Sequence, residues 1–205
     1  AELEGLASPR DGVILDAPSQ GFLFDYYYRG PLPHYPLPRD VPLVADATAA
    51  ELRELAARHS GLWLFLYATH DYDPGDFVEQ WLSNNAFRAW HTWTVNGRLT
   101  YYASYPPEEL IDQPGAARFG ELLELRRFAT RTRPYVAGEV VPLLLNWRAI
   151  APPARDFKLS VRLRDADGFL WGQTDAEPVS GFRPTSTWTP GEEVADRIGV
   201  LILPG

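Results

Sequence analysis

Apolar and polar residues alternate along part of the C-terminal half of the chain. Over residues 156–164 every second position is apolar, from Phe157 to Leu163, and the positions between are polar or basic. This period of two predicts a strand with one face in water. The turn sequence Asp-Ala-Asp-Gly at residues 165–168 leads into a second predicted strand at residues 169–174.

Three more strands are predicted in this half, at residues 121–129, 140–150 and 198–203, with turn residues between them. Five short strands separated by turns predict an all-β antiparallel sandwich over residues 119–205. Pro142 lies inside the second of the three, which predicts an edge strand or a later start, because proline has no N–H for a ladder.

The N-terminal half alternates short apolar runs with helical patterns. Residues 12–16 form an apolar run that predicts a strand, and apolar residues at helical spacing follow between residues 22 and 27. The prolines of residues 34–38 allow only a short extended segment there. Residues 62–68 are continuously apolar, which predicts a central strand covered on both faces.

Two longer helices are predicted from their end signals. One begins at Asp46 or Ala47, with Thr48 and Glu51 as a capping box and Gly61 as the C-terminal cap. The other begins at Asp73, with the carboxylate as the N-cap and proline at the first helical position. Its predicted inner face carries the pairs Phe77/Trp81 and Val78/Leu82.

A hairpin completes this half, because Asn96-Gly97 lies between two apolar segments at residues 88–95 and 98–105. The order of strands and helices predicts an α/β three-layer sheet domain over residues 1–105. A proline- and glycine-containing segment at residues 106–118 is the predicted linker to the β-sandwich domain at residues 119–205.

Composition excludes several functions. The 205 residues contain no Cys, which rules out disulfides and thiolate catalysis, and the net charge of −8 argues against binding nucleic acid. No apolar run reaches the roughly 20 residues that span a bilayer. The chain begins with Ala and contains no Met, which predicts a processed or excised piece of a longer protein.

Polar residues follow two predicted strands of the first half. Asp16 ends the first strand, and His70, Asp71 and Asp73 follow the apolar run at residues 62–68. Because ligands bind beyond the carboxyl ends of strands in open α/β sheets, these four side chains are candidates for holding a sugar or a cation. The alternative is local: Asp73 caps its helix, while His70 and Asp71 are surface turn residues.

Aromatic side chains are the second group of candidates, since flat rings stack on sugar faces. Trp171 and Trp188 lie near turn-rich segments, and Tyr28 is predicted to lie outside the buried stripe of its helix. The alternative is that these rings fill cores. The sequence has no dinucleotide, P-loop or zinc motif, and the Asp165–Gly168 turn lacks the later ligands of a calcium loop, so neither cofactor nor metal is predicted.

Several segments resemble one membrane-enzyme family. They include residues 142–149 (PLLLNWRA), 163–168 (LRDADG), 173–175 (QTD), 184–192 (PTSTWTPGE) and, less specifically, 20–30 (QGFLFDYYYRG). They are similar to the C-terminal extracytoplasmic region of bacterial multi-spanning glycosyltransferases related to protein O-mannosyltransferases and aminoarabinose transferases. In that family, acidic residues of the membrane portion handle the polyprenyl-phosphate-sugar donor, and that portion is not in this chain.

The resemblance implies a non-catalytic extracytoplasmic domain of a membrane-bound glycosyltransferase, with no catalytic residue carried over. Its expected partners are the membrane-embedded portion of its own parent chain and a glycan or peptide acceptor. Two alternatives stay open: a purely structural or protein-docking domain, and a soluble carbohydrate-active enzyme using Asp16, Asp71 and Asp73.

Overall fold

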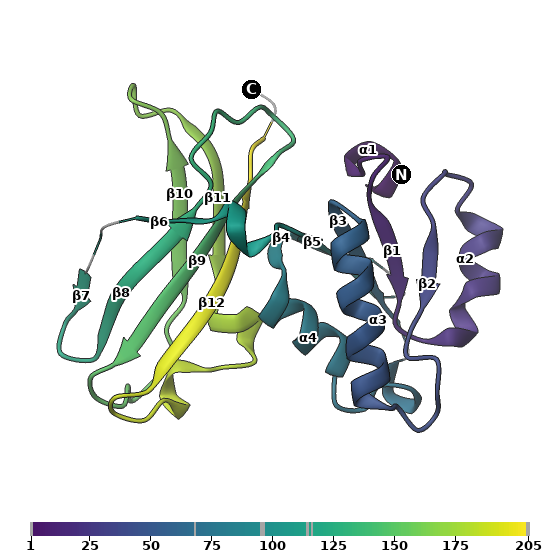
Figure 1. Ribbon diagram of the computed structural model, residues 1–205, viewed down its shortest axis with the longest axis horizontal. Helices are drawn as coiled ribbons and strands as arrows, with labels where there is room; N and C mark the ends of the chain where they lie inside the picture. The colour runs from purple at the N-terminus through teal and green to yellow at the C-terminus, as the bar shows by residue number, and fades with distance from the viewer. Residues whose placement is uncertain (1, 68, 95–96, 114, 116, 204–205) are drawn as a thin grey trace. The chain divides into compact units, whose positions relative to one another are not determined.

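The computed structural model describes residues 2–67, 69–94, 97–113, 115 and 117–203. Within them the protein is mostly β, with a large mixed sheet of ten strands, a small sheet of two strands and few helices. The chain divides into two compact units (Figure 1). Unit 1 comprises Ala1–Ala86 and Trp90–Ser104, and unit 2 comprises Phe87–Ala89 and Tyr105–Gly205.

Unit 1 contains a mixed arrangement of strands in the order β2-β1-β3-β5-β4. Strand β1 pairs in parallel with β2 and with β3, whereas β5 runs antiparallel to β3. The helices and strands are α1 (Glu2–Leu6), β1 (Gly12–Leu15), α2 (Gly21–Tyr27), β2 (His34–Pro36), α3 (Ala45–Arg58), β3 (Gly61–Leu66), α4 (Phe77–Asn85), β4 (Phe87–Thr94) and β5 (Gly97–Ala103).

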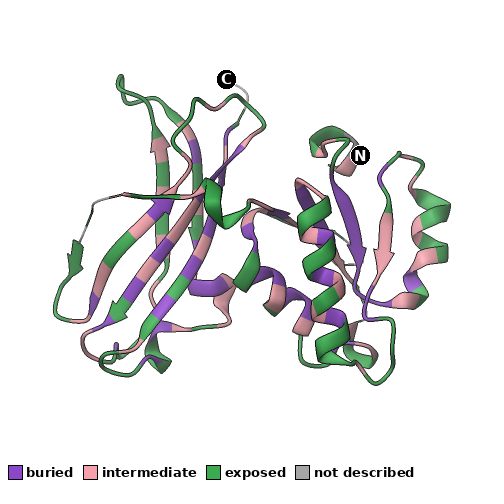
Figure 2. Ribbon diagram, viewed as in Figure 1, coloured by how far each residue is buried: buried purple, intermediate pink, exposed green. Residues whose placement is uncertain are grey.

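Strand β1 is buried along its whole length (Figure 2). Because side chains alternate along a strand, its residues contribute to two separate clusters. Ile14 packs with residues of β3, α3 and α4, whereas Val13 and Leu15 pack with Trp63 and with Phe24 of α2. Burial on both faces explains the continuous apolar run. The central strand predicted at residues 62–68 is confirmed over residues 62–66, which belong to β3, whereas Ala68 lies outside the described residues.

The start of the first long helix is one residue before the earlier predicted position, but its predicted capping residues are wrong. Helix α3 begins at Ala45, Thr48 is buried within it, and Glu51 pairs with the guanidinium of Arg39 instead of forming a capping box. Gly61 is the first residue of β3 and does not cap α3. A Cβ at this position would lie 2.2 Å from the Tyr101 hydroxyl oxygen, so close packing of a ring explains the glycine.

Helix α4 begins at Phe77, three residues after the proline predicted at its first position, although the Asp73 carboxylate does accept hydrogen bonds from its first N–H groups. The intervening Asp76 has a left-handed backbone with φ of 52°. The predicted hairpin is confirmed by the neighbouring strands β4 and β5. Two residues of its predicted turn, Val95 and Asn96, lie outside the described residues.

Unit 2 is built on the strand order β12-β9-β8-β6, with β7 also on β8. The first residues of β4 join it, since Arg88 pairs with Ile198 of β12. The strands are β6 (Ile111–Gln113), β7 (Ala117–Phe119), β8 (Leu123–Thr130), β9 (Val140–Ala149), β10 (Leu159–Arg164), β11 (Leu170–Ala176) and β12 (Glu193–Leu201). Strand β6 and the first two residues of β7 therefore lie within residues 106–118, the segment predicted as a linker.

Strand β9 is central, between β12 and β8, and the prediction of an edge strand at Pro142 is wrong. The Pro142 carbonyl accepts a hydrogen bond from the Thr130 hydroxyl on the β8 side. The nitrogen of Pro142 faces the same side, where the β8 ladder has already ended at the Ala129–Leu144 pair. The missing N–H therefore removes no ladder bond.

Strands β10 and β11 form the small sheet, which packs on the larger one through Leu159, Val161 and Trp171. Gly172 of β11 lies directly on β12, because a Cβ there would sit 2.4 Å from the Leu201 carbonyl oxygen. Next to it, the Leu203 N–H donates to the Trp171 carbonyl at 2.9 Å. The contact between the sheets therefore requires glycine at position 172.

A strained turn lies beside β12. Val179 and Ser180 have left-handed backbones with φ of 51° and 59°, and Val179 is buried. This conformation is unusual for a β-branched residue. The Val179 N–H donates to Oδ1 of the buried Asp196 at 2.8 Å, which holds the turn in place.

We expect Gly172→Ala to lower the free energy of unfolding of unit 2 by about 1–3 kcal/mol, the usual effect of overpacking. Urea unfolding followed by tryptophan fluorescence measures the change. Gly75→Ala is the matched control, because a Cβ at Gly75 has no atom within 4 Å. Equal effects of the two substitutions would contradict the proposed role of Gly172.

Candidate functional site

The chain reverses its direction of travel across the sheet at β1. After β1 it forms β2 on one side and then crosses to β3 on the other, giving the order β2-β1-β3. Such a switch point leaves a crevice beyond the carboxyl ends of the two central strands, where open α/β sheets bind ligands. In this protein the ends are Asp16, after β1, and Tyr67, after β3.

Asp16 is fully buried, with 0% of its surface exposed. Its backbone N–H donates to the Phe65 carbonyl at 3.1 Å, which anchors the residue on β3. Neither carboxyl oxygen has a hydrogen-bond partner among the described residues. A buried carboxyl without partners is costly, particularly in its charged form.

Burial raises the pKa of the Asp16 carboxyl to about 8, and the carboxylates of Asp73, Asp76 and Glu79 contribute to the same rise. Each of these causes disfavours the ionised form. Asp16 is therefore mainly protonated at neutral pH, and a protonated carboxyl can donate one hydrogen bond as well as accept.

Asp73 serves the helix that follows it. Its two carboxylate oxygens accept hydrogen bonds from the backbone N–H groups of Phe77 and Val78, both at 2.8 Å. These are free donors at the N-terminus of α4, so the carboxylate both completes their hydrogen bonding and complements the helix dipole. Asp73 is buried in this position.

Helix α4 also carries a buried polar group toward β5. Glu79 forms an ion pair with Arg98 and accepts a hydrogen bond from the Tyr102 hydroxyl at 3.4 Å. The Tyr102 hydroxyl also lies 3.2 Å from the Ser83 hydroxyl. Two further polar atoms of β5, Nε of Arg98 and Oγ1 of Thr100, are buried without a partner among the described residues.

Gln20 joins the ends of β1 and β3. It follows Asp16 by one short 3₁₀ turn, Pro18–Gln20, and its side-chain amide donates to the Tyr67 carbonyl. The other amide atom, Oε1, is buried and has no partner among the described residues. Gln20 and Asp16 thus contribute three oxygen atoms without a partner among the described residues, from segments that follow β1.

The structure brings only part of the predicted acidic group into this site. Asp16 and Asp73 are both buried and interact electrostatically. His70 and Asp71 lie in the exposed turn Thr69–Asp71. The local alternative for Asp73 is confirmed, because its carboxylate caps α4.

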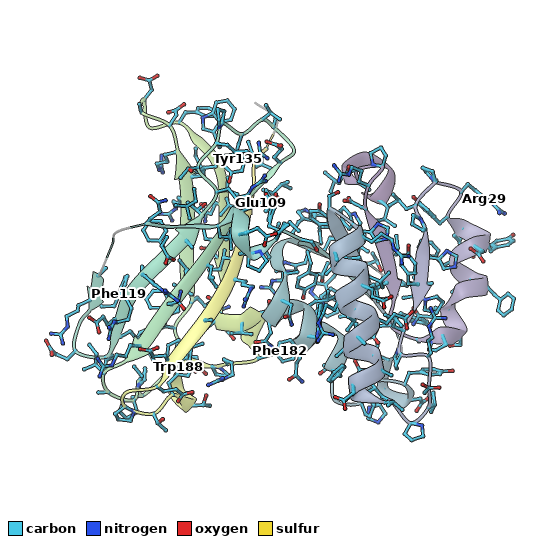
Figure 3. The ribbon with its side chains drawn as sticks, in the orientation of Figure 1. Arg29, Glu109, Phe119, Tyr135, Phe182 and Trp188 are labelled. Carbon is cyan, nitrogen blue, oxygen red and sulfur yellow. The ribbon has the colours of Figure 1, made fainter. Side chains whose placement is uncertain are left out.

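Of the rings expected to be exposed, Trp188 is buried, whereas Tyr28 is half-buried. Trp188, labelled in Figure 3, is only 2% exposed. Its indole N–H donates to the Arg183 carbonyl at 3.1 Å. Tyr28 is half-buried and packs against Phe24, with ring centroids 4.9 Å apart. Helix α2 ends at Tyr27, so Tyr28 follows it with an extended backbone. Its ring packs against the hydrophobic cluster that includes Val13, Leu15 and Trp63.

Trp171 is half-buried at the edge of the small sheet. Its indole N–H donates to Asp165 at 2.9 Å, and its ring lies edge-on to that of Phe169, with centroids 4.9 Å apart. The Asp165–Gly168 turn is thus held by its own hydrogen bonds, including two from the backbone N–H groups of Asp167 and Phe169.

The sequence pattern did not identify Gln20, Glu79, Arg98 or Thr100 as part of this site. One signal was present, because Glu79 and Ser83 are four residues apart and each directly follows a residue of the predicted pair Val78/Leu82. Polar residues at that spacing can share the buried side of a helix. Their partners on β5 depend on strand pairing that the local sequence does not specify.

Three or more His, Cys, Asp or Glu residues placed to hold a metal ion are not found within the described part of the chain. No helix among the described residues is long and apolar enough to cross a membrane. Comparison with family models, curated proteins and solved structures finds no match to this chain.

The free energy of unfolding should fall between pH 4 and pH 8 because of Asp16. Its pKa is about 8 when folded and about 4 when unfolded, so the folded state binds the proton more tightly. The resulting stabilisation is complete below pH 4 and is lost as the pH rises through 8, by on the order of 5 kcal/mol.

Asp16→Asn should remove this loss, so the variant becomes the more stable protein at pH 8. Chemical denaturation at half-unit pH steps measures the difference between the two proteins. Other titrating groups are common to both, including Asp196, whose pKa burial raises to about 6. Asp71→Asn serves as the exposed control. Parallel pH curves for wild type and Asp16→Asn would contradict this account of Asp16.

Proposed function

We propose that this chain is a non-catalytic extracytoplasmic domain of a membrane-bound, polyprenyl-phosphate-sugar-dependent glycosyltransferase, and that it helps to recognise a glycan or peptide acceptor. The similarity of residues 142–149, 163–168 and 184–192 to such enzymes supports the family. In this proposal the domain lies on the extracytoplasmic side and works with the membrane-embedded portion of its parent chain.

The observation that carries the recognition role is the group of unpartnered buried polar atoms beyond the ends of β1 and β3. Asp16 contributes two such atoms and Gln20 contributes one, and the helix-capping carboxylate of Asp73 acts electrostatically on Asp16. Native proteins pair nearly all buried polar groups, so a concentration of exceptions points to an interaction that involves a ligand.

The same geometry weighs against a soluble enzyme built on Asp16, Asp71 and Asp73. Both oxygens of Asp73 are occupied by backbone N–H groups, and Asp71 lies in an exposed turn. A glycoside-cleaving pair needs two carboxyl groups that both reach one bond. We therefore assign no catalytic residue to this chain.

We further propose that the two units are separate domains, an α/β three-layer domain and an all-β sandwich. Two hydrophobic clusters on opposite sides of β1 support the first assignment. Packing of β10 and β11 residues on β9 and β12 supports the second.

Titration of the protein with neutral oligosaccharides, short peptides and short-chain prenyl-phosphate sugars tests recognition. We expect a ligand from one of these classes to shift the backbone amide signals of Asp16, Gln20 and Tyr67, while Asp16→Asn weakens binding at least tenfold. Asp71→Asn should bind as the wild type does. Flat titrations at millimolar concentrations of all three classes would contradict the recognition role.

A second candidate function, docking to the membrane-embedded portion, is favoured by the outer face of α2. Phe22 is 90% exposed and Tyr27 75% exposed, and Leu23 and Tyr26 are also exposed. Figure 2 shows this helix as mostly exposed. Clustered exposed apolar side chains commonly mark interaction sites.

The double substitution Phe22→Ser and Tyr27→Ser should leave the free energy of unfolding within about 0.5 kcal/mol of the wild type, because both side chains are exposed. If α2 docks to the membrane-embedded portion, the same change should reduce cross-linking between the two when they are produced together. Val136→Ser, an exposed apolar residue of unit 2, is the control. Unchanged cross-linking would exclude docking through α2.

A further inference from the structure

Asp16 is an unusual place for a neutral sugar ring to bind. The residue is fully buried, and Gln20 beside it is only 5% exposed. Ser19, next to Gln20 in the chain, and Tyr67, whose carbonyl accepts from Gln20, are both exposed. Only a small group can reach Asp16 and Gln20 without displacing the strands that bury β1.

The charges around Asp16 are negative. Every charged neighbour that acts on its carboxyl is acidic: Asp73 and Asp76, from the turn before α4, and Glu79, from α4 itself. Arg98 on β5 faces the same helix, but its guanidinium is paired with Glu79. Such surroundings favour a ligand group with positive charge.

The hydrogen-bonding atoms also indicate how many donors that group should have. Three buried acceptors lack partners among the described residues, namely Oδ1 and Oδ2 of Asp16 and Oε1 of Gln20. A primary ammonium has three N–H donors and no acceptor. A divalent metal ion fits less well, because the described residues contain no group of three or more His, Cys, Asp or Glu side chains placed to hold one.

We propose that Asp16 and Gln20 bind a primary ammonium group of the ligand, with one N–H donated to each of their three unpartnered oxygens. This inference rests on the proposed recognition role and specifies its chemistry. The ammonium can belong to an amino sugar or to a peptide amine. On binding, the O–H bond of the Asp16 carboxyl breaks and its proton passes to the solvent, while the ligand keeps its own three protons.

This exchange makes proton release the distinguishing measurement. Because the pKa of free Asp16 is about 8, an ammonium that binds only the carboxylate should release about 0.9 proton at pH 7 and about 0.1 at pH 9. For an amine that stays charged throughout, the apparent affinity should rise about 50-fold from pH 6 to pH 8.

The experiment is isothermal titration calorimetry of the whole chain in two buffers with different ionisation enthalpies. Two pairs of probes distinguish the source of the ammonium: N-acetyl-lysine amide against N-acetyl-norleucine amide, and glucosamine against glucose. We expect binding of at least one amine, at least tenfold weaker binding of its uncharged partner, and proton release at pH 7. Which amine binds more tightly identifies a peptide or a sugar.

Asp16→Asn should weaken amine binding at least tenfold and abolish proton release, whereas Asp71→Asn should change neither. The proton count on the wild type needs no variant, so the test survives if Asp16→Asn fails to fold. Equal binding of charged and uncharged partners, binding without proton release, or no amine binding would each overturn the ammonium site. Recognition itself would still stand if neutral oligosaccharides bound at Asp16.

Discussion

The candidate site depends on the parallel pairing of β1 with β3, because hydrophobic clusters bury both faces of β1. All four residues of β1 are buried. The next residue, Asp16, lies at the end of this buried strand and is itself fully buried. The backbone bond from Asp16 to Phe65 keeps it on the strand end. Its protonation state therefore follows from sheet architecture and from the acidic residues that open α4.

The buried polar groups of the candidate site are of two kinds, those paired within the protein and those without a partner among the described residues. Asp73 and Glu79 are satisfied within the protein, by helix N–H groups and by Arg98 with Tyr102. Asp16 and Gln20 keep unpartnered oxygens among the described residues. A paired buried carboxylate stabilises local structure. An unpaired buried polar group lowers the free energy of unfolding, and a ligand that donates a hydrogen bond to it recovers that cost as binding free energy. This contrast separates the residues that build the site from those proposed to bind.

The sequence predicted the parts of the site that depend on local pattern. An apolar run followed by an acid placed Asp16 at a strand end, and Asp73 before a helical pattern predicted its capping role. It did not predict Glu79 opposite Arg98, because that pairing requires β5 to lie against β3. Gly61 was misassigned for the same reason, since the ring that excludes a Cβ there belongs to Tyr101, forty positions along the chain. Long-range packing likewise buried Trp188.

The left-handed turn at Val179 depends on a hydrogen bond to Asp196, which is 17 positions further along the chain. Its backbone conformation is one that glycine adopts readily and valine does not. The Asp196 carboxylate compensates by accepting the Val179 N–H inside the core of unit 2. An evolutionary change that removed the acid at position 196 would therefore favour a glycine at position 179. Substitutions at these two positions should be epistatic, so that neither residue evolves independently of the other.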